Sequence, residues 1–224
     1  MNRELAKYLE EFVTQNRIET INKLLGYRTR YITVLLEDIF QSQNASAVLR
    51  TCECLGIQDV HIIENQHKYV INPDVALGSN KWLNIIKYNE KENNVKTAIN
   101  SLRSKGYRIV ATIPGKNCTL LEDFNLENGK AVLLFGAELN GLSNEILELS
   151  DEFLSIPMYG FTRSFNISVS AAIILHRLVS KLRSSKIDWS LSEPEKLDIR
   201  IKWLKESIKN SDILENSFLC RLNS

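Results

Sequence analysis

The chain has 224 residues, of which 44% are hydrophobic and 25% are charged, and its formal net charge is +1. These proportions are typical of a globular protein, and the apolar content is too high for a disordered chain. A run of about 18 apolar residues is absent, which excludes a membrane-spanning helix. The first four residues lack the apolar segment of a secretory signal. Taken alone, a net charge of +1 argues against a nucleic-acid partner.

The charge is unevenly distributed along the chain. Residues 1–30 carry a net charge of +2, residues 31–176 carry −4 and residues 177–224 carry +3. The last part opens with a cluster of basic residues that contains no acid, namely Arg177, Lys181, Arg183 and Lys186. Such a cluster can contact RNA phosphates, although charge alone favours a solvated helix face.

The cysteines and histidines do not form a recognisable metal site. Cys52 and Cys54 are separated by one residue, so they match neither a redox nor a zinc CxxC pair. His61, His67 and His176 form no HxxxH or HExxH pattern. We therefore expect no metal, and reduced thiols in a cytoplasmic protein without a membrane partner.

Apolar runs and helical patterns alternate along the chain. We expect strands over residues 31–37, 59–63, 84–88, 107–113, 131–135 and 153–156. We expect helices over residues 3–25, 43–55, 91–105, 143–149, 167–184 and 194–210. Gly26, Gly56 and Gly106 follow three of these helices as stop signals. The alternation predicts an α/β domain with a mostly parallel sheet, flanked by N- and C-terminal helices.

The expected domain lacks the glycine-rich turn of a classical nucleotide-binding fold, because no glycine occurs between Gly26 and Gly56. Ligands of open α/β sheets bind at the carboxyl ends of strands. Three polar segments are expected there: NASAVLR (44–50), FGAELNG (135–141) and IPMYGFTRSFNISVSAA (156–172). Each has an ordinary explanation on its own, as a helix cap, a solvated side chain or a plain turn.

Together, these segments resemble the three motifs of the SpoU (TrmH) family of S-adenosylmethionine-dependent RNA ribose 2′-O-methyltransferases. The family patterns are N-x-x-A-x-x-R, F-G-x-E-x-x-G and I-P-M-x-G-x-x-x-S-L-N-V-S. All three appear here in order, within about residues 31–180. Phe165 stands where the family usually has leucine, which concerns the shape of the pocket, and Ile167 replaces valine conservatively.

The resemblance implies a deep trefoil knot in the α/β domain and a homodimer whose active site is shared across the interface. It implies S-adenosylmethionine as the cofactor, with contacts from Thr112, Gly136, Ile156 and Phe165. The same resemblance implies an essential Arg50, acting either as a base or as a group that holds a phosphate and stabilises the developing alkoxide. Further catalytic residues implied in this way are Asn44, Glu138, Ser164 and Asn166. We expect Asn44, Ser164 and Asn166 to orient Arg50, the substrate and the knot loop, and Glu138 to brace the second motif's turn.

The parts outside the motifs narrow the expected substrate. We expect an N-terminal helical arm over residues 1–27, a knotted domain over 28–180 and a C-terminal arm over 181–224. Short arms resemble the branch of the family that methylates guanosine 18 in the tRNA D-loop. Arg177, Lys181 and Arg183 would then contact the tRNA backbone. Two alternatives stay open: a methyltransferase acting on ribosomal RNA or another tRNA position, and an RNA-binding relative without activity.

Overall fold

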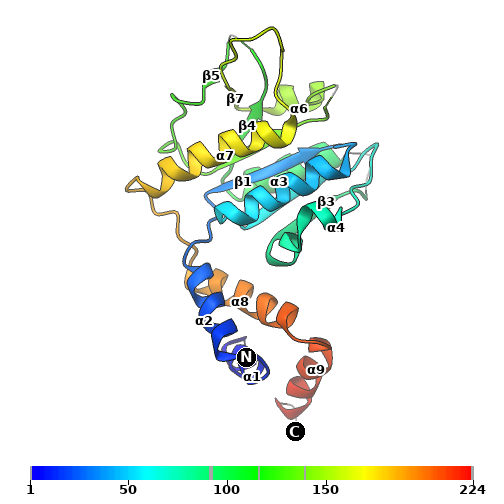
Figure 1. Cartoon of the computed structure of the whole chain (residues 1–224), viewed down its shortest axis with the longest axis vertical. Helices are drawn as coiled ribbons and strands as arrows, with labels where there is room; N and C mark the ends of the chain where they lie inside the picture. Colours follow the sequence, from blue (N-terminus) through cyan, green and yellow to red (C-terminus); the bar gives the residue numbers. More distant parts are fainter. Residues whose placement is uncertain (1, 91–92, 116, 139, 223–224) are drawn as a thin grey trace. The chain divides into compact units, whose positions relative to one another are not determined.

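The computed structural model describes residues 2–90, 93–115, 117–138 and 140–222, which form two compact units (Figure 1). One unit combines both ends of the chain, residues 1–28 and 190–224, and the other comprises residues 29–189. We describe each unit by itself. Within the described ranges, no helix is both long and apolar enough to cross a membrane.

The unit of residues 29–189 is built on a parallel sheet of seven strands in the order β3-β2-β1-β6-β4-β7-β5. The strands are β1 (Ile32–Glu37), β2 (Asp59–Ile63), β3 (Asn84–Tyr88), β4 (Arg108–Thr112), β5 (Thr119–Leu120), β6 (Ala131–Phe135) and β7 (Glu152–Ser155). Six of them confirm the expected strands to within one or two residues. The sequence analysis missed β5, because two exposed residues at the sheet edge carry no apolar pattern.

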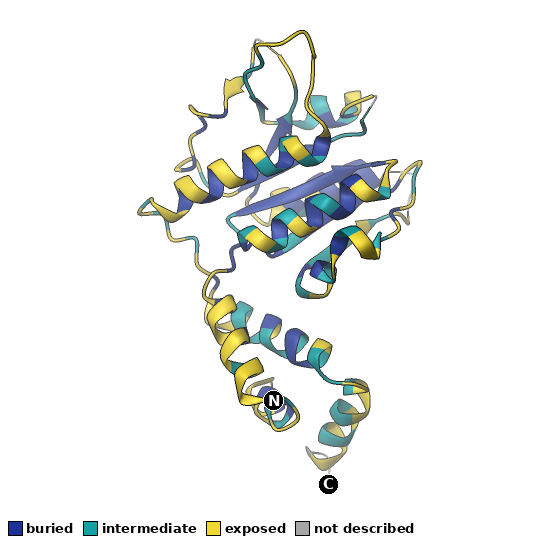
Figure 2. Ribbon diagram, in the orientation of Figure 1, coloured by how far each residue is buried: buried dark blue, intermediate teal, exposed yellow. Residues whose placement is uncertain are grey.

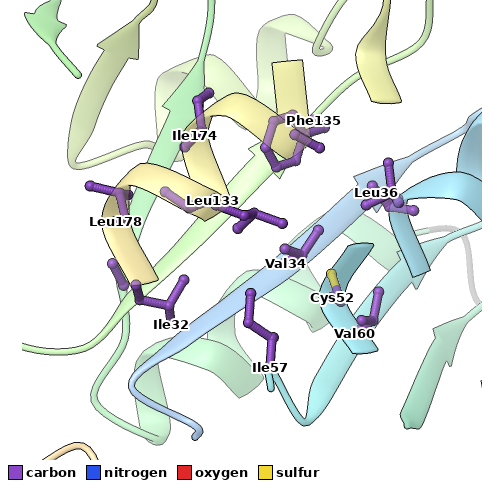
Figure 3. Close-up of a cluster of buried hydrophobic side chains, with 14 of the residues drawn as sticks. Ile32, Val34, Leu36, Cys52, Ile57, Val60, Leu133, Phe135, Ile174 and Leu178 are labelled. Atoms are coloured by element: carbon purple, nitrogen blue, oxygen red, sulfur yellow. The ribbon is translucent and has the colours of Figure 1, made fainter. Parts of the chain in front are cut away.

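Helices cover both faces of this sheet. They are α3 (Ser42–Leu55), α4 (Pro73–Ala76), the 3-10 helix η1 (Ser79–Trp82), α5 (Asn94–Ser104), α6 (Asn144–Leu149) and α7 (Ile167–Arg183). Val34 and Leu36 of β1 belong to a core shared with α3 and α7, shown in Figure 3. Leu35 belongs to the opposite core, shared with α5 and α6. Burial on both faces explains why β1 reads as a continuous apolar run.

The order of the strands places β1 at the point where the winding of the sheet changes direction. From β1 the chain proceeds through α3 to β2 and then to β3 on one side. It then crosses to β4 on the other side, and β6 later fills the position between β1 and β4. The carboxyl ends of β1, β6 and β4 therefore lie next to one another, which is where open α/β sheets bind their ligands.

In its described residues, 2–28 and 190–222, the terminal unit has four helices, α1 (Asn2–Glu10), α2 (Gln15–Leu25), α8 (Glu193–Ser207) and α9 (Ser211–Leu222). The single helix expected over residues 3–25 is wrong, because the chain turns at residues 11–14 and Thr14 caps α2 by accepting the Arg17 N–H. The helix expected over 194–210 ends at Ser207, and α9 was not expected. Inside this unit Trp203 is buried under the Arg28 guanidinium, 4.9 Å from the ring centroid.

Candidate functional site

A cavity of about 520 Å³ lies at the carboxyl ends of β4 and β6. Three segments line it, together with Leu147 and Ser170: residues 112–114 after β4, described residues between 135 and 142 after β6, and residues 164–167 at the start of α7. A smaller hollow of about 50 Å³ shares Thr112, Ser164 and Phe165 with it and adds Ile156. The second and third motifs therefore meet at one place, as expected from the direction of the strands.

Asn44 connects the first motif to the other two. Its amide nitrogen donates to the Glu138 carboxylate at 2.8 Å and to Gln41 Oε1 at 3.0 Å. Its amide oxygen accepts from Asn166 Nδ2 at 3.1 Å. The ordinary explanation of Asn44 as a helix cap is wrong, because the side chain is buried in the first turn of α3 and turned toward the site.

Asn166 has two roles at once. Its Oδ1 accepts the backbone N–H of Ser168 at 2.9 Å, which caps the N-terminus of α7. The other end of the same amide donates to Asn44. The cap therefore fixes the orientation of the amide, and the direction of the bond to Asn44 follows from it.

The turn of the second motif is closed by backbone contacts. Ala137 and Gly141 exchange two hydrogen bonds of 2.9 and 3.0 Å. Gly136 allows this turn, because a Cβ atom there would lie 2.1 Å from the carbonyl carbon of Gly141. The position therefore accepts only glycine, for lack of space between two stretches of backbone.

Glu37, which the sequence analysis treated only as the end of a strand, braces the segment after this turn. Its buried carboxylate accepts the Ser143 backbone N–H at 2.8 Å. Burial raises the pKa of Glu37 above its ordinary value, and the hydrogen bonds from Ser143 oppose that rise. Glu138, for which this bracing role was expected, instead accepts from the Asn44 side chain. The signal for Glu37 was a carboxylate directly after five buried apolar or hydroxyl residues.

Arg50 lies away from this group. Its side chain is exposed on α3, and within the described residues it forms no hydrogen bond or ion pair. It lies six positions after Asn44 on the same helix, which puts the two side chains about 120° apart around the helix axis. The structure thus brings together Asn44, Glu138 and Asn166, while Ser164 lies exposed on the cavity rim and Arg50 points elsewhere.

The four expected cofactor contacts all line the two adjoining cavities. Gly136 lines the larger one, Ile156 the smaller one, and Thr112 and Phe165 line both. The Thr112 hydroxyl donates to the Leu134 carbonyl at 2.6 Å, so it holds β4 against β6. Phe165 is 42% exposed and forms part of the cavity mouth. The described residues contain no group of three or more potential metal ligands.

The three expected RNA contacts have partners within their own unit. Arg177 pairs with Glu122, Lys181 donates to the Phe124 carbonyl at 2.7 Å, and Arg183 donates to the Leu55 carbonyl at 3.1 Å. All three residues are exposed, and each side chain has more N–H groups than these bonds use.

The unit boundaries also change the charge distribution. Residues 1–28 and 190–224 together hold eleven basic and ten acidic residues, and residues 29–189 hold seventeen of each. The positive excess that the sequence analysis gave to the two ends includes Arg30 and the basic residues of α7, which belong to the α/β unit.

The fold and the site define an α/β protein with a small-ligand cavity at the carboxyl edge of a parallel sheet. The chain belongs to the SpoU rRNA Methylase family, which matches residues 31–176. This confirms the resemblance seen in the three motifs.

Relatives and solved structures extend the similarity beyond that region. The tRNA (guanosine(18)-2′-O)-methyltransferase of Borreliella burgdorferi is 48% identical over 93% of both chains. The enzyme of the same name from Aquifex aeolicus is 31% identical over 89% of this chain and 94% of its own. The crystal structure of the A. aeolicus TrmH/SpoU tRNA modifying enzyme is similar with a TM-score of 0.76 at 29% identity, covering 88% of this chain and 98% of that one.

The SpoU methyltransferase AviRb from Streptomyces viridochromogenes, solved in complex with AdoMet, shares the fold. Its TM-score is 0.59 at 24% identity, over 71% of this chain and 60% of its own.

Proposed function

We propose that this protein transfers a methyl group from S-adenosylmethionine to the ribose 2′-hydroxyl of guanosine 18 in tRNA. The observation that carries the proposal is the 48% identity, over 93% of both chains, to a relative named for that reaction. The hydrogen bonds that join Asn44 to Glu138 and Asn166 support it, because Glu138 and Asn166 line the cavity and Asn44 contacts both of them.

The cavity fits the proposed cofactor. Its volume of about 520 Å³ lies in the ordinary range of small-ligand pockets, roughly 300 to 1,000 Å³. Phe135, Leu142 and Leu147 supply apolar walls suited to an adenine ring, and the turn at Gly136 brings backbone to the same wall. When bound, the cofactor would supply an electrophilic methyl group, and Thr112, Gly136, Ile156 and Phe165 would hold it.

The protein's own residues would then orient the hydroxyl, and its proton would pass to solvent water at the cavity mouth. Transfer would form the bond from the 2′-oxygen to the methyl carbon and break the bond from that carbon to sulfur. The described cavity lining contains no histidine or cysteine to act as an ordinary base. We propose that Arg50 holds a phosphate and stabilises the developing alkoxide, because a guanidinium normally stays protonated. Asn44, Glu138, Ser164 and Asn166 would position the substrate.

We propose a homodimer, which also accounts for the position of Arg50. Val169 and Ile173 are exposed apolar residues spaced four apart on α7, so they form one stripe, and Phe165 is an exposed apolar residue just before the helix begins. Figure 2 shows exposed and buried positions alternating along α7 and along α3, which packs against it. A second copy on this stripe would bring Arg50 of the partner subunit to the cavity. The deep trefoil knot belongs to the same proposal, and the insertion of β6 between the earlier strands β1 and β4 supports it.

The tRNA backbone would be contacted by the exposed basic residues Arg177, Lys181 and Arg183, and by the terminal helices. Contacts of this kind make binding strongly dependent on salt. An affinity for tRNA that stays flat between low and moderate salt would contradict the assignment. We also propose that the protein acts in the cytoplasm, which agrees with four free cysteines.

The deciding experiment is incubation of the protein with S-adenosylmethionine and unmodified tRNA transcript, followed by mapping of the methylated nucleotide. Methylation at guanosine 18 supports the proposal. Methylation at another tRNA position, or of ribosomal RNA only, would contradict the assigned substrate. Binding of tRNA without any transfer would mean an inactive relative.

A further inference from the structure

The loops after β1 and β2 bring together two rings, the exposed Phe40 and the half-buried His67. Phe40 is 72% exposed, although it is a large apolar residue. Its ring contacts the His67 imidazole edge to face, with centroids 5.0 Å apart and planes at 71°. An edge contact of this geometry leaves a face of the Phe40 ring open to solvent. Exposure of a single apolar residue is common, so the placement of this ring carries the argument.

Hydrogen bonds to Asp38 hold together the two loops that carry the rings. Asp38 has a left-handed backbone with φ of 47°, and its Oδ1 accepts the backbone N–H groups of Asn65, Gln66 and His67 at 2.7, 2.8 and 3.3 Å. The Asp38 N–H in turn donates to the Ile63 carbonyl at 3.0 Å. These bonds join the loop that carries Phe40 to the loop that carries His67, so the rings keep a fixed relation to the sheet.

The loop that carries Phe40 leads directly into the site. Gln41 follows Phe40, and its Oε1 accepts from the Asn44 amide at 3.0 Å. The same amide nitrogen donates to Glu138 at 2.8 Å. The Phe40 ring therefore belongs to a loop whose next side chain contacts the site network.

RNA-binding proteins recognise bases that are splayed out of loops by stacking them on aromatic side chains. We infer that Phe40, held by Asp38 and His67, is the platform on which the base of the target nucleotide stacks while its ribose enters the site. Phe40 is then a residue that determines substrate specificity. The inference rests on the proposed function, because it requires an RNA substrate.

The test compares Phe40 variants on two RNAs. One RNA is the unmodified tRNA transcript, and the other is the same RNA with an abasic nucleotide at the target position. On the intact RNA, Phe40→Ala and Phe40→Leu should lower kcat/KM by about 10-fold or more, and Phe40→Tyr should stay near wild type, because only the ring stacks. On the abasic RNA all four proteins should be equal.

Val70→Ala is the matched control, because Val70 is 69% exposed on the same loop as His67 and forms no ring contact. It should leave both rates unchanged. Equal loss for Phe40→Ala on intact and abasic RNA would overturn the inference, as would no loss on either. Dissociation of a dimer in Phe40→Ala would also overturn it, because the ring would then contact a second copy.

If the proposed function is wrong, equilibrium binding tests the inference about Phe40 separately. If the wild-type protein transfers no methyl group to tRNA, the same variants and RNAs are compared by equilibrium binding. A loss of affinity in Phe40→Ala that disappears on abasic RNA still supports the platform. Equal affinity for wild type and Phe40→Ala on the intact RNA would overturn it.

Discussion

Asn44 and Glu138 lie 94 positions apart in the chain, and the Asn44 amide nitrogen donates a 2.8 Å hydrogen bond to the Glu138 carboxylate. The same amide contacts Asn166, 122 positions away, through its oxygen. One buried amide thus joins three loops that β1, β6 and β7 bring to the carboxyl edge of the sheet. Because this side chain both donates and accepts hydrogen bonds, few other residues can replace it.

We expect Asn44→Asp to lose activity and to cost about 1–3 kcal/mol in the free energy of unfolding, because it replaces the donor to Glu138 with a second carboxylate. Urea denaturation and methyl transfer measure the two effects. In the double variant Asn44→Asp with Glu138→Gln, the new amide at position 138 can donate to the new carboxylate at position 44, so part of the stability should return. Strict additivity of the two single changes would show that the residues are not coupled.

Gly136→Ala should destabilise the fold by about 3 kcal/mol or more, because its Cβ would meet backbone rather than a movable side chain. Cofactor binding measured by calorimetry should be lost with it. Gly160→Ala, in the third motif, is the control. The nearest atom to a Cβ there is 4.0 Å away, so its stability should change by less than about 0.5 kcal/mol. Similar losses in both variants would contradict the steric explanation.

Arg50→Lys should fold normally and bind cofactor normally, because the side chain is exposed and has no partner among the described residues. Turnover should fall by at least about 100-fold, because lysine lacks the fork that holds an oxyanion. If Arg50 acts across the dimer, mixing Arg50→Lys with Asn166→Ala should restore activity in heterodimers. Wild-type turnover in Arg50→Lys would show that the guanidinium is not needed.

Ile173→Glu should convert the proposed dimer into a monomer, because it places a charge on the apolar stripe of α7. Light scattering measures the molar mass. Methyl-transfer activity should fall as the dimer is lost. Ile213→Glu is the control, since Ile213 is 66% exposed and belongs to the terminal unit. A wild-type enzyme that is monomeric in solution would contradict the proposed interface.

His61 should make the protein less stable in acid. Burial lowers the pKa of His61 from 6.5 to about 4, so the folded protein keeps it neutral while the unfolded chain takes up a proton. The contribution of neutral His61 to the free energy of unfolding is fully present above about pH 6.5. It is lost as the pH falls to about 4, at a cost of roughly 3 kcal/mol.

Denaturant unfolding of wild type and His61→Gln, at about pH 7.5 and about pH 4.5, measures this difference. Glutamine stays neutral throughout and can still bond the Tyr88 hydroxyl, which lies 3.0 Å from His61 Nδ1. The variant should therefore lose less stability in acid than wild type. Equal losses would mean that other groups cause the acid sensitivity.

Local pattern was sufficient for six of the strands in the described sheet and for the motifs. Continuous apolar runs marked β1 and β6 because both faces of the sheet are buried, and Gly56 ends α3 in the left-handed conformation as expected. These features depend on neighbouring residues alone. The break before Thr14 and the short strand β5 were missed because their local signals are weak.

Only the tertiary structure decided what the motif residues contact. The winding of the sheet brings the ends of β1 and β6 together, so Asn44 meets Glu138 and Glu37 meets Ser143. It also gives Arg177 a carboxylate partner in Glu122. The sequence by itself identified the candidate residues for the chemistry, because the short spacings of the motifs reflect local backbone. Their pairing depends on crossovers that join positions about a hundred residues apart, and no local pattern contains that information.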